Sequence, residues 1–235
     1  MTQRTKAAEK IIVALDVPTK TEALALVEQL RDQISTFKIG LQLYTAQGPE
    51  IVRAVLETGA KVFLDLKLHD IPNTVGRAVE SASQLGVHML TIHLSGGEEM
   101  IAAAVGARSE SLAILGVTVL TSLNEQTLRA TGVASKVADQ VLRLAQLGEK
   151  AGVNGIVSSP HEIKLLRRNL TRSMKLVIPG IRSSASPTGD QKRVMSAGEA
   201  FAEGADYVVI GRPVTATPNP LEALAKILNE LHSSV

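Results

Sequence analysis

The chain contains no cysteine and no tryptophan, and it has only two tyrosines and three phenylalanines among its 235 residues. Without cysteine there can be no disulfide, no thiolate zinc site and no cysteine nucleophile, so any metal would need oxygen or histidine ligands. Aromatic side chains make up 2% of the sequence, which leaves no stacking platform for nucleic-acid bases. Since hydrophobic residues still make up 45%, the core must be built from Leu, Ile, Val and Ala.

Charge and hydropathy exclude further classes of protein. The formal net charge is +2, from 25 basic and 23 acidic residues, and no long run of either sign marks a surface for nucleic acid or membrane. No apolar run approaches the roughly 20 residues that cross a bilayer. Residues 1–10 are polar and lack the apolar core of a signal peptide. We therefore expect a soluble, cytoplasmic protein with a small-molecule ligand.

Short apolar or β-branched runs alternate along the chain with segments of helical periodicity. Strands are predicted at residues 11–17, 36–43, 61–68, 89–94, 112–120, 155–158, 175–178 and 207–210. Helices are predicted at residues 21–31, 49–58, 74–85, 136–151 and 221–231. Such alternation implies parallel strands with right-handed crossovers, and eight units close most naturally into a (β/α)8 TIM barrel. We expect one α/β domain over residues 1–235, with an open doubly wound sheet as the alternative.

The most informative segment is 65–74, where a lysine stands between two carboxylates at the end of an apolar strand. On an extended strand Asp65 and Lys67 share one face, while the leucines between and beside them point to the other. Asp70 follows where the strand has ended, and Pro72 suits the first turn of a helix. Nearby carboxylates favour the charged form of Lys67, which predicts a proton donor rather than a free amine. An ordinary ion pair at a strand end would give the same short pattern.

Other polar residues also follow apolar strands, and in a (β/α)8 enzyme the chemistry lies at the carboxyl ends of the strands. These strand-end candidates are Asp16, Lys38, Asp65, Lys67, His93, Thr121, Arg182 and Arg212. The first four alternate in sign and could form a network, but as a purely structural device such a network would be an odd choice. A polar ligand explains it better. His93 could equally be a structural residue, and we leave it out of the mechanism.

A phosphate site is predicted after the last two strands. Gly211 and Arg212 follow strand eight, and Gly180 and Arg182 follow strand seven, where barrels of this kind often bind phosphate through backbone N–H groups. Arginine adds bidentate contacts to phosphate oxygens. Residues 182–189 are rich in Ser, Pro and Gly and predict a loop that either closes over a ligand or is simply solvated.

Taken together, these residues resemble the orotidine 5′-phosphate decarboxylases, and the resemblance covers nearly the whole chain. It rests on segments 14–16, 37–40, 65–74, 117–122, 179–182, 189–191 and 210–212. Segment 65–74 is highly specific, and the other segments come in the expected order. One departure is Leu94, because a smaller residue is expected after His93.

The resemblance implies decarboxylation of orotidine 5′-phosphate to uridine 5′-phosphate, the last step of de novo pyrimidine nucleotide synthesis, with no metal or cofactor. Lys67 would stabilise and protonate the C6 carbanion, held by Asp65 and by Asp70 of the partner subunit, and Asp65 would also crowd the substrate carboxylate. The other positions implied are Asp16 and Lys38 for the ribose, with Lys38 also in the carboxylate network, Thr121 for the pyrimidine, Gln191, Gly211 and Arg212 for the phosphate, Arg182 for the lid, and Thr74 beside Asp70 for the partner's site. The expected assembly is a homodimer with shared active sites, without nucleic-acid or membrane partners.

Three alternatives remain open. Mg²⁺-dependent sugar-phosphate decarboxylases and aldolases of the same barrel group share the Asp-x-Lys-x-x-Asp pattern, but they carry an acidic metal ligand on strand two, where this chain has Lys38. A Schiff-base aldolase would need Lys67 as a free amine. A non-catalytic protein that binds a phosphate ligand would give no reason for Lys67 and Asp70. Sensitivity to chelator, trapping by borohydride and binding without turnover would identify them, respectively.

Overall fold

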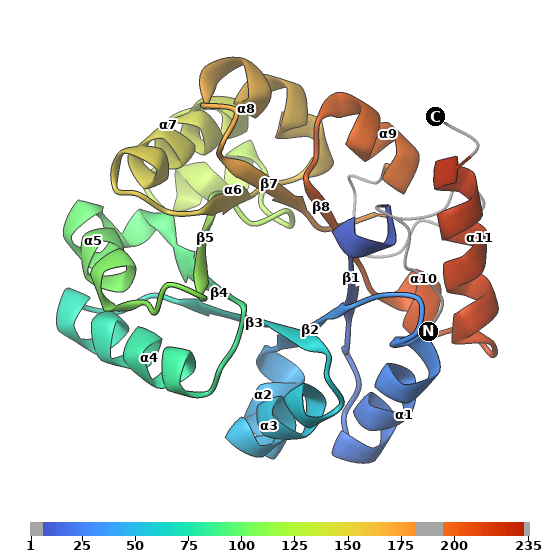
Figure 1. Cartoon of the computed structure of the whole chain (residues 1–235). Helices are drawn as coiled ribbons and strands as arrows, with labels where there is room; N and C mark the ends of the chain where they lie inside the picture. Colours follow the sequence, from blue (N-terminus) through green and yellow to red (C-terminus); the bar gives the residue numbers. More distant parts are fainter. Residues whose placement is uncertain (1–6, 182–194, 233–235) are drawn as a thin grey trace.

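The computed structural model describes residues 7–181 and 195–232. Within these residues eight parallel strands close into a barrel in sequence order, and the helices form a ring around it (Figure 1). The strands are β1 (Ile11–Ala14), β2 (Thr36–Gly40), β3 (Lys61–Leu68), β4 (Met89–His93), β5 (Ala113–Val117), β6 (Gly155–Val157), β7 (Lys175–Ile178) and β8 (Tyr207–Ile210). The predicted (β/α)8 barrel is confirmed.

The helices alternate with the strands, as expected for βα units. They are α1 (Lys20–Leu30), α2 (Leu41–Gln47), α3 (Pro49–Glu57), α4 (Pro72–Gln84), α5 (Glu98–Ala107), α6 (Glu125–Ala130), α7 (Val137–Lys150), α8 (Ile163–Asn169), α9 (Ala197–Glu203), α10 (Arg212–Thr215) and α11 (Pro220–His232), with 3-10 turns η1 (Ala8–Lys10), η2 (Leu94–Gly96) and η3 (Pro160–Glu162). The helices predicted from periodicity are α1, α3, α4, α7 and α11. In the part of the chain that the structure describes, no helix is both long enough and apolar enough to span a bilayer.

Several strands are shorter than predicted, and at β2 the residues beyond the strand form a helix instead. This strand was expected to reach residue 43 but ends at Gly40, and the next residues form α2. Likewise β1 ends at Ala14 and not at residue 17, and β5 ends at Val117 and not at residue 120. The apolar runs continue past the strands because Leu43 and Val119 are also buried, and an apolar run alone does not reveal where the ladder stops.

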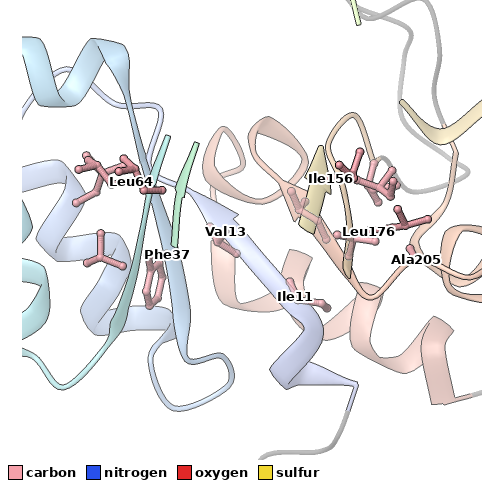
Figure 2. Packing of buried hydrophobic residues seen from close by; sticks show 14 of the residues in the cluster. Ile11, Val13, Phe37, Leu64, Ile156, Leu176 and Ala205 are labelled. Atoms are coloured by element: carbon pink, nitrogen blue, oxygen red, sulfur yellow. The ribbon is translucent and has the colours of Figure 1, made fainter. Parts of the chain in front are cut away.

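The core has two layers that follow the alternation of side chains along each strand. The outer layer packs strand residues against the helices, and Figure 2 shows members such as Ile11, Val13 and Phe37. The barrel interior is a separate small cluster that includes Ile12, Phe63, Leu115 and Val177, all from odd-numbered strands. Barrel interiors are filled in this way, by layers of side chains from alternate strands.

This alternation also orients two charged residues. Phe37 and Ile39 belong to the outer layer, so Lys38 between them faces the interior of the barrel. Leu64 belongs to the outer layer as well, and Asp65 after it faces inward. Both charges therefore lie above the apolar interior, toward the carboxyl ends of β2 and β3.

The unexpected Leu94 fits because two glycines leave room for it. Leu94 is fully buried at the start of η2, directly after β4. A Cβ atom on Gly116 would lie 2.5 Å from Leu94 Cδ2, and one on Gly148 would lie 2.8 Å from the same atom. The larger side chain after His93 is thus accommodated because Gly116 on β5 and Gly148 on α7 have no side chain there.

Candidate active site

Four charged side chains form a continuous network at the carboxyl ends of β1 to β3. Lys38 Nζ lies 3.2 Å from Asp16 Oδ1 and 3.5 Å from Asp65 Oδ2. Lys67 Nζ donates to both oxygens of Asp65, at 2.8 and 2.9 Å. The order Asp16, Lys38, Asp65, Lys67 therefore alternates in sign through space, which is the arrangement that the strand-end pattern predicted.

Asp65 is the centre of this network. Its side chain is only 13% exposed, and such burial raises the pKa of a carboxyl group. The opposing influences are the positive charges of Lys38 and Lys67 and the hydrogen bonds from Lys67 and Thr91, and together they bring the pKa of Asp65 below its ordinary value. Asp65 is therefore a carboxylate, and it fixes the positions of two ammonium groups.

The backbone at Lys67 departs from a regular strand. Lys67 has a φ of +51°, and among residues 7–181 and 195–232 it is the one non-glycine residue with a positive φ. At the same place Leu64 pairs with Leu90 and Leu68 pairs with Ile92. The chain therefore advances by four residues along β3 and by only two along β4, which is a β-bulge. A left-handed residue of this kind is strained by about 1–2 kcal/mol. Regular alternation predicted the direction of the Lys67 side chain but not this bulge.

The network borders a cavity of about 500 Å³ at the carboxyl end of the barrel. One wall carries Asp16, which follows β1, and the charged residues of β2 and β3. The facing wall is mainly apolar and comes from the later strands and the loops after them: Val117, Val119, Leu120, Val157, Pro179, Ile181 and Val209. The cavity can therefore hold a molecule that is polar on one side and apolar or flat on the other.

Most of the candidate residues lie at this cavity. The lining includes Asp16, Lys38, Asp65, Lys67, Thr121, Gly211 and Arg212. Asp70 and Thr74 are exposed instead and do not line the cavity of their own chain, and Asp70 accepts the N–H of Ile71 at 2.7 Å. Arg182 and Gln191 lie outside the described residues.

His93 lies beside the network rather than in the cavity wall. Its ring centroid is 5.3 Å from that of His69, which comes from the turn after β3. Burial, and then the charges of His69 and Lys67, lower the pKa of His93 against the opposing influence of Asp65. The neutral form of His93 is therefore favoured next to the charged lysine.

The sequence analysis missed two residues at the site. Gln42 lines the cavity from the first turn of α2, and it was missed because this segment was predicted as strand. Thr91 is fully buried on β4, where its hydroxyl accepts the N–H of Lys67 at 2.9 Å and donates to Asp65 Oδ1 at 2.9 Å. A signal for Thr91 was available, since it is a lone polar residue in the middle of an apolar strand.

Comparisons with known proteins place this geometry in a family. The family described as "Orotidine 5'-phosphate decarboxylase / HUMPS family" matches residues 9–227. The chain is 46% identical over 234 residues to an orotidine 5'-phosphate decarboxylase of Dictyoglomus turgidum, covering 96% of each chain. It is 47% identical over 222 residues to that of Actinobacillus succinogenes, covering 93% of this chain and 96% of the relative. The crystal structure of orotidine 5'-phosphate decarboxylase from Lactobacillus acidophilus superposes with a TM-score of 0.83 at 31% identity, over 95% of this chain and 99% of that one.

Proposed function

The chain belongs to the orotidine 5'-phosphate decarboxylase / HUMPS family, and we propose that it converts orotidine 5′-phosphate to uridine 5′-phosphate and CO₂ with Lys67 as the catalytic acid. This reaction is the last step of UMP biosynthesis. The observation that carries the assignment of roles is the Lys67 ammonium, held by both oxygens of Asp65 at the wall of the cavity.

The chemistry requires a fixed positive charge beside one carbon atom. When the bond between C6 and the carboxylate breaks, CO₂ leaves and the electron pair remains on C6, where the pyrimidine ring offers it no adjacent electron sink. An ammonium group already in place stabilises that charge without reorganisation at the moment of reaction. Lys67 then gives one proton to C6 and becomes a neutral amine, which regains a proton from water. Asp65 keeps the Lys67 ammonium directed at C6 and also crowds the departing carboxylate.

The rest of the cavity suits the remainder of the nucleotide. Asp16 offers acceptor oxygens and Lys38 offers N–H donors to the ribose hydroxyls, and Thr121 offers a hydroxyl to the pyrimidine. Gly211 and Arg212 lie at the end of β8, where we place the phosphate, and we assign Gln191 to the same group and Arg182 to the lid. Binding energy from the distant phosphate would position the reacting carbon against Lys67.

We also propose that the reaction needs no metal ion or cofactor. The place between the carboxylates of Asp16 and Asp65 is held by the Lys38 ammonium, which lies 3.2 Å and 3.5 Å from them. A divalent cation binding there would have to displace this like charge. The geometry thus favours decarboxylation by the lysine over the Mg²⁺-dependent alternative.

A homodimer would complete each site. Asp70 and Thr74 are exposed and do not line their own cavity, and Ile71 between them is 66% exposed at the same end of the barrel. Leu41 and Leu120, which follow β2 and β5, are also exposed there. A second subunit packed on this end would cover the apolar side chains and bring Asp70 of the partner subunit to Lys67. Because the substrate is a charged nucleotide that does not cross a bilayer unaided, we place the enzyme in the cytoplasm.

Turnover of orotidine 5′-phosphate in excess EDTA tests the function. We expect wild-type protein to turn over and Lys67→Ala to lose at least about ten-thousandfold in kcat, because the variant lacks both the stabilising charge and the proton donor. Lys150→Ala is the matched control, since Lys150 is an exposed lysine whose partner is Glu98 on the helix ring. A folded wild type without turnover, or turnover that EDTA abolishes, would contradict the proposal.

Mixing two inactive variants tests the shared site. Lys67→Ala keeps Asp70, and Asp70→Asn keeps Lys67, so a mixed dimer has one site with both groups intact. Random exchange of subunits in an equal mixture should restore about one quarter of the wild-type sites. If the mixture stays inactive although native mass spectrometry detects mixed dimers, Asp70 acts within its own chain, and if Asp70→Asn alone is active, Asp70 has no part in the site.

A further inference from the structure

We infer that Thr91 is a positioning residue for the decarboxylation, because its single hydroxyl joins the backbone of Lys67 to the carboxylate of Asp65. The inference rests on the function proposed above. Thr91 lies on β4 and is fully buried, and it is not among the residues that line the cavity. It therefore acts through the two charged residues and not on the substrate.

The hydrogen-bond directions around this hydroxyl are fixed by its neighbours. The Lys67 N–H can only donate, so the Thr91 oxygen accepts at 2.9 Å. Asp65 is a carboxylate and can only accept, so the hydroxyl gives its one proton to Asp65 Oδ1, also at 2.9 Å. A hydrogen bond to an ionised group is stronger than one between neutral groups. The hydroxyl thus uses its one proton and one of its acceptor positions within the network.

This hydroxyl also replaces a missing ladder contact. The bulge in β3 removes Lys67 from regular pairing with β4, and its backbone is left-handed. A buried N–H without an acceptor would destabilise that conformation. Since threonine is β-branched and stiff at χ1, its oxygen is a rigid acceptor on a regular strand. The Oγ1 atom of Thr91 thereby fixes both the strained backbone of Lys67 and Asp65, the carboxylate that pairs with the Lys67 ammonium.

The consequence for catalysis follows from the position of Lys67 Nζ. Its side chain is anchored at one end by the backbone that Thr91 holds and at the other end by Asp65, which Thr91 also holds. Small displacements of a catalytic group lower the rate strongly while leaving distant substrate contacts intact. For Thr91→Val, which keeps the shape and removes the hydroxyl, we expect kcat to fall about ten- to a hundredfold and KM to change less than about twofold.

The pH profile supplies a readout that a loss of packing alone would not move. The hydrogen bond from Thr91 is one of the influences that lower the pKa of Asp65. Without it the carboxylate takes up a proton at higher pH, so the acid limb of kcat/KM should shift to higher pH in Thr91→Val. The shift should also appear in a ¹³C NMR titration of the Asp65 carboxyl group, which does not depend on turnover.

Two further variants separate the hydroxyl from the rest of the side chain. Thr91→Ser keeps the hydroxyl and loses the methyl group, and it should restore kcat to within about threefold of wild type with an unshifted acid limb. Thr118→Val is the matched control, because Thr118 is also a buried threonine but donates to a backbone oxygen, that of Val157, at 3.0 Å. It should lower stability without changing kcat or the pH profile.

Several results would overturn the inference. Thr91→Val could match Thr118→Val in kcat and pH profile, or Thr91→Ser could be as impaired as Thr91→Val. If Thr91→Val does not fold, Thr91→Ala also removes the hydroxyl, and an unshifted Asp65 titration in that variant contradicts the inference equally. If the wild type lacks turnover, the proposed function fails, whereas the NMR titration still decides whether Thr91 controls Asp65.

Discussion

The two ends of the barrel each carry a cluster of charged residues, and the clusters differ in what satisfies them. The catalytic-end cluster consists of Asp16, Lys38, Asp65 and Lys67, and its ion pairs join side chains to side chains beside a cavity. The opposite-end cluster consists of Arg167, Lys175 and Asp206, near the starts of β7 and β8. There Arg167 pairs with Asp206 and donates to the backbone oxygens of Gly204 and Met174, at 2.6 and 2.8 Å.

The difference separates a cluster that is committed to the fold from one that we propose to act in catalysis. Asp206 also accepts the N–H of Leu176 at 2.9 Å, and its Oδ1 lies 3.3 Å from Lys175 Nζ. The carboxylate of Asp206 therefore fixes the loops between strands and helices. In the catalytic-end cluster the carboxylates face the ammonium groups of Lys38 and Lys67, and both lysines also line the cavity. Charges at a strand end do not by themselves indicate a site. Two further features indicate a site here. A cavity adjoins the charges, and among the described residues the ammonium groups of Lys38 and Lys67 make no hydrogen bond to the backbone.

Replacing one aspartate of each cluster by asparagine tests the difference between the two ends most strongly. Asp65→Asn removes the charge that fixes both ammonium groups, and we expect kcat to fall by about a thousandfold or more. Asp206→Asn weakens the contacts with Arg167 and Lys175, and we expect it to lower the free energy of unfolding by about 1–3 kcal/mol while kcat stays within about twofold. Steady-state kinetics and urea unfolding on both variants check this. Equal losses of activity would mean that the two clusters are not functionally distinct.

Much of the fold could be predicted because the sequence repeats one signal. β3, β7 and β8 have the predicted bounds, and the helices with a wide apolar face were found, such as α7 with its buried Val141 and Leu144. The short helix α2 was predicted as strand. In α2 only Leu43 is buried, so one apolar residue after a strand was taken for a continuation of that strand. Local periodicity cannot indicate where the chain turns out of the barrel, because that depends on the neighbouring strand.

The site was predictable as far as alternation determines it. The inward direction of Lys38, Asp65 and Lys67 follows from period two and from the apolar residues between them. The bulge at Lys67 and the contact with Thr91 join residues 24 positions apart and depend on how β3 and β4 pair when the barrel closes. No pattern within either strand contains that register. The phosphate end remains a prediction, because Arg182 and Gln191 lie outside the described residues.

The smallest expected effect concerns the two ends of a single strand. His88 precedes β4 and His93 ends it, and in both the folded state lowers the pKa below the ordinary value of 6.5. Burial is the first cause in each case, followed by Lys61 for His88 and by His69 and Lys67 for His93. Between the lowered pKa of each folded histidine and about pH 6.5, the unfolded chain therefore binds more protons than the folded one, so both histidines reduce stability as the pH falls through this range.

Removing one neighbouring charge should separate the two histidines. Lys67→Ala takes away a positive charge beside His93, so the pKa of His93 should rise while that of His88 does not change. Lys61→Ala should do the reverse, since Lys61 lowers the pKa of His88 at the opposite end of the barrel. NMR titration of the two imidazole rings measures both pKa values in one sample. A shift of both rings in either variant would mean that the charges act across the whole length of β4, and that the two ends of the barrel are electrostatically coupled rather than independent.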